Sequence, residues 1–321
     1  MSKNQIHEKF VKAIRERIPH KATLTNTLVD LLCIEREAVY RRMRGDVAFT
    51  FEEIATISNK LGISLDNLVG SYSVKSRPYQ LCLVEYIDPI EDDYKMWETY
   101  NERLKEARVD PASSSVECMN VLPTIFLLDY NFISRFYLFK WYNQYGYSEK
   151  TAHFCQIEPA EKFREVQRIT AIESKHVKNT TYVWDPLIFQ YIVNDIRYYS
   201  SVHLIDAEEV GLLKRDLLRF VDEIEDLAAR GTYKETGNPI QFYISNINFD
   251  ASYSYLETKN LHISIIRAFI LNTVISFDEK AYEIFHSWLQ ALLKSSTMIS
   301  VSGEKQRIMF FEKQRAIIGS L

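Results

Sequence analysis

The first 70 residues carry many helix signals in a short length of chain. Apolar residues recur at helical spacing in five segments, at about 6–17, 23–32, 35–44, 50–61 and 64–69. Pro19, Gly45 and Gly62 separate these segments, because proline stops a helix and glycine readily takes the left-handed conformation that follows one. Thr50 and Glu53 have the spacing of a capping box at the start of the fourth segment. The pattern predicts a compact five-helix domain with little room for an enzyme site.

Within this domain, one stretch has a more specific pattern: TLVDLLCIEREAVYRRMRGDVAFTFEEIATISNKLGISLDNLVG. Leu28 and Ile34 flank a turn, Val39 lies in the middle of the next helix, and Arg44 and Gly45 close that helix. In these features the stretch resembles the Cro/repressor-type (Xre) helix-turn-helix family. The resemblance implies that the helix at 23–32 lies across the DNA backbone and that the helix at 35–44 enters the major groove of double-stranded DNA.

The chemistry of the helix at 35–44 also suits that role. Val39 and Met43 are four residues apart and face inward, which leaves the opposite side of the helix open. Arginine can bind guanine through two hydrogen bonds or a phosphate through its charge, and tyrosine can pack on a thymine methyl group or reach a phosphate. The candidate DNA-binding residues are Arg36, Glu37, Tyr40, Arg41 and Arg44, together with Thr25, which stands where the family usually has glutamine.

The stretch also departs from the family pattern. Val29 stands where the family usually has alanine, and Cys33 stands at the turn where it has glycine. Because cysteine lacks the conformational freedom of glycine, we expect a slightly altered turn. Glu35 and Glu37 favour the start of the helix through its dipole, but they would repel phosphates unless they accept hydrogen bonds from cytosine amino groups.

Composition limits where nucleic acid could bind and in which compartment the chain works. The formal net charge is −4, so any contact with DNA must be local to one surface. The four cysteines lie far apart and form no Cys-x-x-Cys pair, which favours a reduced, cytoplasmic compartment over a disulfide framework. The polar N-terminus has no apolar signal core, and no stretch of sequence is long and apolar enough to predict a membrane span.

No catalytic or cofactor motif stands out in the sequence. The seven histidines show no metal-ligand spacing, and the pair His153-x-Cys155 alone is a weak signal that more often reflects a core or surface role. There is no Gly-x-Ser-x-Gly, phosphate loop or Gly-x-Gly-x-x-Gly motif, and the chain has only nine glycines. We therefore expect neither an enzyme, nor a bound metal, nor a cofactor.

A linker at 71–78 follows the first domain of residues 1–70, because small, polar and basic residues gather there before Pro78. The remaining part, 79–321, is predicted to be mainly helical. Its expected helices are at about 91–107, 122–145, 159–176, 185–203, 206–230, 279–294 and 303–318. Between 240 and 275, three β-branched and aromatic runs predict a small antiparallel sheet. The expected fold class is mainly α, with a five-helix helix-turn-helix domain and a larger helical domain that carries this sheet.

Two features of the larger part leave alternatives open. The segment 126–147 is dense in aromatic residues on both sides of a predicted helix, which favours a buried core helix over a ligand pocket or a subunit interface. The helix at 206–230 has an apolar seam with coiled-coil-like spacing, which favours packing within the chain over a dimer contact.

These observations together predict a sequence-specific transcription regulator. In this hypothesis it is a homodimer, because two recognition helices on a twofold axis match a palindromic site. The larger domain would serve dimerisation or the sensing of a small-molecule or protein effector. The alternative is a protein–protein interaction adaptor that uses the helix-turn-helix fold without binding DNA.

Overall fold

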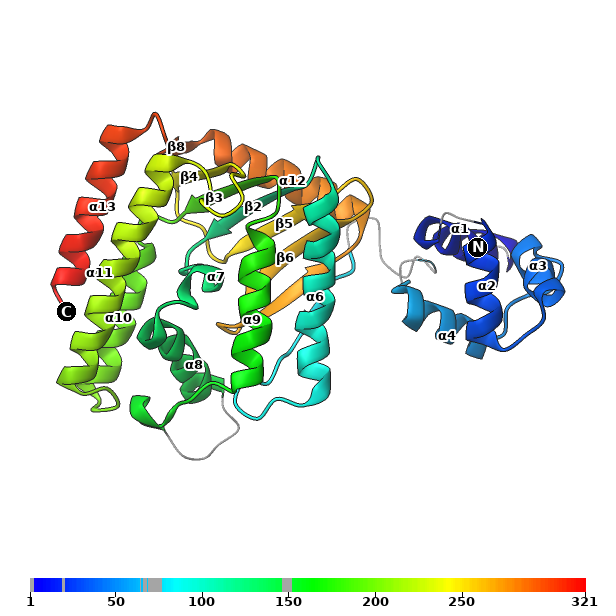
Figure 1. Cartoon of the computed structure of the whole chain (residues 1–321), viewed down its shortest axis with the longest axis horizontal. Coiled ribbons are helices and arrows are strands. Elements are labelled where there is room, and N and C mark those ends of the chain that lie inside the picture. The colour runs from blue at the N-terminus through cyan, green and yellow to red at the C-terminus, as the bar shows by residue number, and fades with distance from the viewer. Residues whose placement is uncertain (1–2, 19–20, 64, 66–67, 69–76, 146–151) are drawn as a thin grey trace. The chain divides into compact units, whose positions relative to one another are not determined.

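The computed structural model describes the chain except for residues 1–2, 19–20, 64, 66–67, 69–76 and 146–151 (Figure 1). The chain divides into two compact units, Met1–Pro78 and Tyr79–Leu321, which we call unit 1 and unit 2. Apart from Arg77 and Pro78, most of the linker predicted at 71–78 lies outside the described residues. Among the described residues, no helix combines the length and the apolar character needed to cross a bilayer.

All regular secondary structure in the described part of unit 1 is helical. Its helices are α1 (Lys3–Arg17), α2 (Lys21–Leu32), α3 (Arg36–Arg44) and α4 (Phe51–Leu61). The predicted fifth helix at 64–69 falls mostly outside the described residues. Each of the four helices contributes a fully buried side chain to one core, namely Ile14, Leu28, Val39 and Ile57. Because one apolar residue from every helix meets in the same core, the position of α3 is fixed by the three others.

Unit 2 contains a sheet much larger than the sequence predicted, so the expected mainly helical fold class with a small antiparallel sheet is wrong. Eight strands form one mixed sheet in the order β1-β7-β6-β5-β2-β3-β4-β8. The strands are β1 (Gln80–Cys82), β2 (Ser114–Met119), β3 (Asn179–Trp184), β4 (Ile240–Ser245), β5 (Tyr253–Glu257), β6 (His262–Ala268), β7 (Asn272–Ser276) and β8 (Ser296–Met298). The three runs predicted between 240 and 275 form β4, β5 and β6, and β5 and β6 pair in antiparallel fashion as expected. β4, however, pairs in parallel with β3, so the runs do not make a separate sheet.

The missed strands have physical reasons to escape a sequence pattern. β2 and β3 pair in parallel and are covered on both faces, so burial does not require a strict alternation of apolar and polar residues along them. β1 and β8 are edge strands of three residues each, too short to show any period. Long crossovers of helix join β2 to β3 and β3 to β4, as parallel strands require.

The helices of unit 2 agree well with their predicted segments, with one exception. They are α6 (Glu91–Val109), α7 (Thr124–Leu127), α8 (Asn131–Tyr145), the short 3-10 turn η1 (Phe154–Gln156), α9 (Glu161–Ser174), α10 (Ile188–Ser201), α11 (Ala207–Arg230), α12 (Glu279–Lys294) and α13 (Glu304–Gly319). The single helix expected at 122–145 is broken into α7 and α8. A carboxylate from α11 explains the break, because Asp216 accepts a hydrogen bond from the Phe132 N–H at 2.9 Å and so supports a new helix start.

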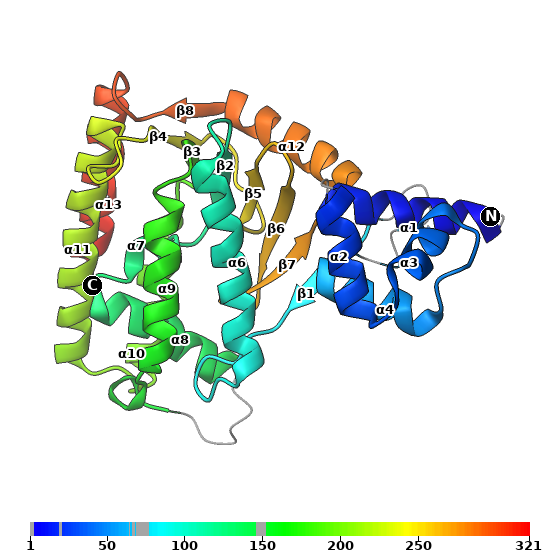
Figure 2. The ribbon, with the colours of Figure 1, turned by 45° about the vertical axis from the view of Figure 1, so that its right-hand side comes forward.

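Helices cover both faces of the sheet. Figures 1 and 2 show α6 and α9 side by side over one face, with α7 between α9 and α11. On the opposite face, α12 packs through Tyr282, Phe285 and Leu289 against Val116 and Val183. Each face therefore has its own apolar core.

Both open questions about the larger part are resolved towards internal packing. In the aromatic segment, Phe136, Tyr137, Phe139 and Trp141 of α8 are buried in the main core, as the reading of a core helix predicts. The side chains of Tyr145 and Tyr147 lie outside the described residues. The seam of α11 is also buried within the chain, against α8 and α13.

Candidate nucleic-acid interface

The turn between α2 and α3 has a strained residue at its first position. Cys33 has a φ of 52°, in the left-handed region that favours glycine. Cysteine therefore adopts a backbone conformation here that glycine would adopt without strain. The thiol of Cys33 is exposed and lies 3.7 Å from the Asp30 carbonyl oxygen.

The other end of α3 is closed by a glycine cap. Gly45 has a φ of 86°, and its N–H donates to the Arg42 carbonyl at 3.0 Å. The Asp46 N–H donates to the Arg41 carbonyl at 2.9 Å, which completes a Schellman motif. The turn before α3 and the cap after it thus define the nine-residue length of the helix.

The exposed side of α3 is formed by the residues that the sequence singled out. On a helix of 3.6 residues per turn, these side chains share an arc of about 140°. The exposed members of that arc are Arg36, Glu37, Tyr40, Arg41 and Arg44. Val39 on the opposite side is fully buried, and Met43 packs against the same core. The helix therefore presents three guanidinium groups, one phenol and one carboxylate to solvent.

The three exposed arginines differ in their contacts. Arg36 donates from Nη2 to Oδ1 of Asn26, on α2, at 2.5 Å. Arg44 is held by two carboxylates, at 2.9 Å from Nε to Oδ2 of Asp46 and at 3.5 Å from Nη2 to Oε1 of Glu37. The hydrogen bond that Arg44 donates to Asp46, together with the charge of that carboxylate, raises the pKa of Arg44. Among the described residues, the guanidinium of Arg41 makes no hydrogen bond or ion pair, so it is free to meet a phosphate.

The fourth arginine of the helix has a structural role. Arg42 lies on the inner side of α3 and binds Glu53 of α4 through both carboxylate oxygens, at 2.8 Å from Nε and 2.7 Å from Nη2. Glu53 also accepts a hydrogen bond from the Thr50 N–H, while its own N–H donates to the Thr50 hydroxyl. Burial raises the pKa of Glu53, but the hydrogen bonds from Arg42 and Thr50 outweigh it and leave this pKa below its usual value. One carboxylate thus joins α3 to the start of α4.

A histidine from α1 supports the C-terminal end of α3. Nε2 of His7 lies 2.9 Å from the Arg42 carbonyl oxygen, which also accepts the N–H of the capping Gly45. The imidazole ring stacks on Phe49 with 5.7 Å between ring centroids. His7 therefore orients α3 from outside the helix-turn-helix segment.

One of the DNA-binding residues predicted from the sequence is buried in the structure. The side chain of Thr25 is only 4% exposed, because it lies on the inner side of α2, so we leave it out of the proposed DNA contacts. The sequence did not predict the contacts that Asn26, His7 and Glu53 make with α3. Asn26 and Arg36 are ten residues apart on different helices, and no local period relates them.

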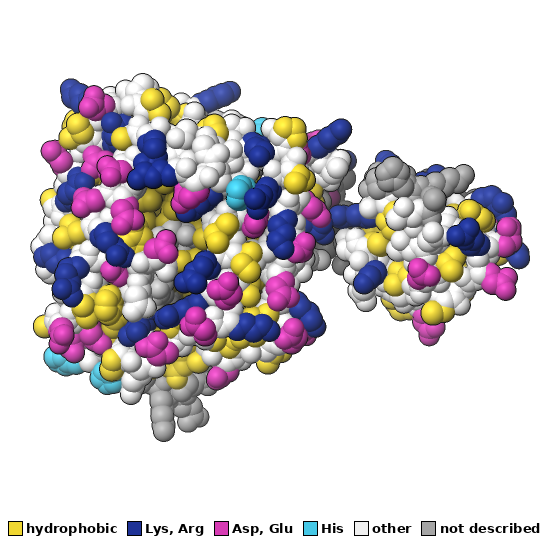
Figure 3. All heavy atoms as spheres, viewed as in Figure 1, with side chains coloured by type: hydrophobic (Ala, Val, Ile, Leu, Met, Phe, Trp, Pro, Cys, Tyr) yellow, Lys and Arg dark blue, Asp and Glu magenta, His cyan; other side chains and the backbone are white. Residues whose placement is uncertain are grey.

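Charge is distributed unevenly between the two units. Residues 1–78 contain 13 Lys and Arg against 9 Asp and Glu, a formal charge of +4, although the whole chain has −4. Residues 79–321 therefore carry −8. In Figure 3, basic and acidic side chains are mixed over the visible face of unit 2. An electrostatic attraction for a polyanion is thus expected of unit 1 alone.

The helices α2 and α3, joined by a tight turn and supported by α1 and α4, define a helix-turn-helix domain. Residues 6–90, about a quarter of the chain, match the family model of the BetR domain. This is a DNA-binding domain of the helix-turn-helix type found in transcription regulators, so that general prediction is confirmed. The match does not specify the Cro/repressor-type family. Neither a curated protein nor a solved structure matches the chain.

Proposed function

We propose that the chain is a sequence-specific transcription regulator in which α3 enters the major groove of double-stranded DNA. Arg36, Glu37 and Tyr40 lie in the first half of α3, the part of a recognition helix that reaches base edges. Arg41 and Arg44 lie nearer its end, where they meet phosphates. The observation that carries the proposal is the exposed arc of α3, whose guanidinium groups point away from the core while Arg42 turns inward.

We also propose that the chain binds DNA as a homodimer. One recognition helix contacts only a few base pairs, and a twofold axis doubles the contacts on a palindromic site. In this proposal unit 2 serves dimerisation or the sensing of a signal. The abundance of acidic residues in unit 2 supports a division of labour, because a unit with a charge of −8 is repelled by the DNA backbone.

The test is a binding assay with duplex sites selected from genomic fragments by the full chain. Arg36→Ala is expected to relax the base preference at one position, because a paired contact to guanine is worth about 1–3 kcal/mol of discrimination. Arg41→Ala is expected to weaken binding to all sequences alike and to reduce the salt slope by about one.

Arg168→Ala is the matched control, since Arg168 is an exposed arginine of α9 in unit 2 with an ion pair to Glu165. If the double variant Arg36→Ala/Arg41→Ala kept the affinity and salt slope of the unchanged chain, α3 would not be the recognition helix. If the chain bound no duplex at low salt but retained a protein partner, the adaptor hypothesis would replace the regulator.

A further inference from the structure

Two opposite charges lie deep inside unit 2 and act on each other at a distance, without direct contact. Glu117 is on β2 and Arg267 is on β6, and within the described residues neither forms an ion pair. Glu117 accepts a hydrogen bond from the Tyr182 hydroxyl at 3.1 Å, and Arg267 donates from Nη1 to the Ile270 carbonyl at 3.1 Å. Buried charges are costly unless they are paired, so this pair of unmatched groups requires an explanation.

The sheet register places both groups on the same face. Glu117 is opposite Tyr182 of β3 on one side and Ser254 of β5 on the other. Ser254 is in turn opposite Ile265, two residues before Arg267 on β6. Side chains two residues apart on a strand point to the same face. The carboxylate and the guanidinium therefore look out from the face that α6, α7 and α9 cover.

Both charged side chains border a space that protein encloses. Glu117 and Arg267 are enclosed by protein, yet each keeps part of its surface accessible. A side chain that is deep and still partly accessible borders an internal space, and a space lined by polar groups holds water or a ligand. Figure 3 shows that this face of unit 2 is hollowed between α11 and α9, with hydrophobic side chains in the hollow. α7 lies there, and its Phe126 ring lies on Tyr182 at 5.2 Å between centroids.

Tyrosines surround each of the two charges. Burial raises the pKa of Tyr100, Tyr182 and Tyr233, and the charge of Glu117 raises each of them further. Near Arg267 are two more phenols, which belong to Tyr86 and Tyr137. Their oxygens are engaged with the backbone, since Tyr86 donates to the Leu271 carbonyl at 2.7 Å and Tyr137 accepts from the Leu122 N–H at 3.2 Å.

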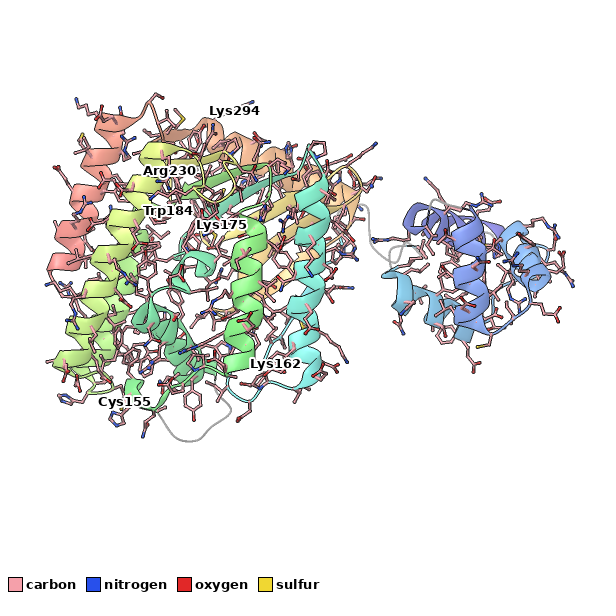
Figure 4. All side chains as sticks on the ribbon, in the orientation of Figure 1. Cys155, Lys162, Lys175, Trp184, Arg230 and Lys294 are labelled. Carbon is pink, nitrogen blue, oxygen red and sulfur yellow. The ribbon has the colours of Figure 1, made fainter. Side chains whose placement is uncertain are left out.

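A loop fixed to α9 brings one of these tyrosines into the site. The Lys175 carbonyl, at the end of α9, accepts hydrogen bonds from the Thr236 hydroxyl at 2.9 Å and the Asn238 amide at 3.1 Å. The Lys175 ammonium also binds Glu235 at 2.7 Å. This loop carries the buried ring of Tyr233 towards Glu117. Figure 4 shows Lys175 and Arg230 at the ends of α9 and α11.

We propose that this space is a binding site for a small amino carboxylic acid, with the ligand carboxylate on Arg267 and its ammonium group on Glu117. Guanidinium binds a carboxylate through two parallel hydrogen bonds, and a carboxylate surrounded by aromatic rings suits an ammonium group. A ligand with both charges pairs both buried groups at once, whereas a simple anion or a simple amine leaves one of them unpaired. The binding of the ligand does not depend on the proposed function. Only the role of the site, the sensing of a signal by unit 2, rests on it.

The experiment measures thermal unfolding of the full chain by tryptophan fluorescence, since all four tryptophans lie in unit 2. The probes are the common L-amino acids, β-alanine and γ-aminobutyrate, each added alone at millimolar concentration. Propionate and propylamine are the probes that carry one charge only. We expect at least one amino acid to raise the melting temperature in a saturable way, and neither single-charge probe to do so.

Glu117→Gln and Arg267→Gln are each expected to weaken that binding at least about tenfold, because one ion pair of the ligand is lost. The exposed changes Glu102→Gln and Arg168→Gln are the matched controls and leave binding unchanged. The proposal is overturned if no amino acid shifts the melting temperature, if propionate alone gives the full shift, or if the shift survives in both buried variants. The single-charge probes test the unchanged chain, so the outcome stands even if a variant fails to fold.

DNA binding by the same preparation separates this site from the proposed function. An amino acid that binds a chain unable to bind DNA supports the site and contradicts the regulator. A chain that binds its selected duplex but no amino acid supports the regulator and contradicts the site.

Discussion

Arg42 and Glu53 form a two-pronged ion pair between α3 and α4, with both side chains about 15% exposed. The pair holds α3 from its inner side, while Arg41, one position earlier, faces solvent. Adjacent arginines thus have separate tasks because successive residues of a helix point in directions about 100° apart.

Removing this ion pair is expected to destabilise unit 1. Arg42→Ala leaves the carboxylate of Glu53, only 14% exposed, without its cation, which we expect to lower the free energy of unfolding by about 2 kcal/mol. Arg44→Ala is the control, because the side chain of Arg44 is 59% exposed and its pairs with Asp46 and Glu37 are screened by water. Amide hydrogen exchange of peptides from α3 and α4 measures the effect. Equal protection in the two variants would show that the buried pair does not stabilise the domain.

A change at the α2–α3 turn is expected to stabilise the same unit. Cys33→Gly removes the strain of a left-handed cysteine, which costs about 1–2 kcal/mol, and part of that gain is lost to the greater freedom of glycine in the unfolded chain. We expect a net increase of roughly 0.5–1 kcal/mol in the free energy of unfolding. Cys33→Ala is the matched control, because it removes the thiol and keeps the strain. If alanine stabilised unit 1 as much as glycine, the thiol rather than the backbone would be responsible.

Much of unit 1 and most helices of unit 2 were predictable because their information is local. α4 has its capping box and final glycine within 13 residues, and α11 has Asp206 at its start, Gly231 at its end and a regular apolar seam between them. The sheet was not predictable to the same degree. In β2 and β3 the neighbours that make a strand favourable come from parallel partners about 65 residues apart, and short buried strands have no clear period.

The exposed arc of α3 and the buried pair of Glu117 and Arg267 also differ in how far local sequence predicts them. The exposed arc of α3 follows from a helical period within nine residues, so its residues could be identified from the sequence. The partner that holds Arg36 lies on another helix, and the pair Glu117 and Arg267 is separated by 150 residues. Each of those residues looks ordinary in its own segment. Only the fold shows that Asn26 is a neighbour and that the two buried charges face one space.

Releasing Arg44 from its carboxylates is expected to strengthen DNA binding. Asp46→Asn removes the closest negative charge, 2.9 Å from the Arg44 Nε, and with it a group that repels phosphates. We expect a few-fold tighter binding to duplex DNA of any sequence at low salt, and a smaller gain as the salt concentration rises. Glu208→Gln changes the net charge equally in the first turn of α11 and is the control. A gain of the same size in that control would assign the effect to net charge rather than to α3.

The buried carboxyl of Glu117 is expected to make unit 2 less stable as the pH rises. Burial raises the pKa of Glu117 to about 7, although the hydrogen bond from Tyr182 and the charge of Arg267 act in the opposite direction. In the unfolded chain its pKa is 4.5, so the folded chain binds more protons between about pH 4.5 and about pH 7. The free energy of unfolding therefore falls through that window, by about 3 kcal/mol from this group, and stays low above it.

Glu117→Gln removes this dependence while it keeps the shape of the side chain. Below about pH 4.5 we expect the variant and the unchanged chain to be similarly stable, since both then carry a neutral group at this position. Above about pH 7 the variant is expected to be the more stable, because it has no charge to bury. Urea unfolding followed by tryptophan fluorescence, without added amino acids, measures the difference at each pH. The exposed Glu102→Gln, with its side chain 65% accessible, should show no such divergence. If the stability difference between Glu117→Gln and the unchanged chain were constant across the window, Glu117 would titrate like a solvated carboxyl and would not border a closed polar space.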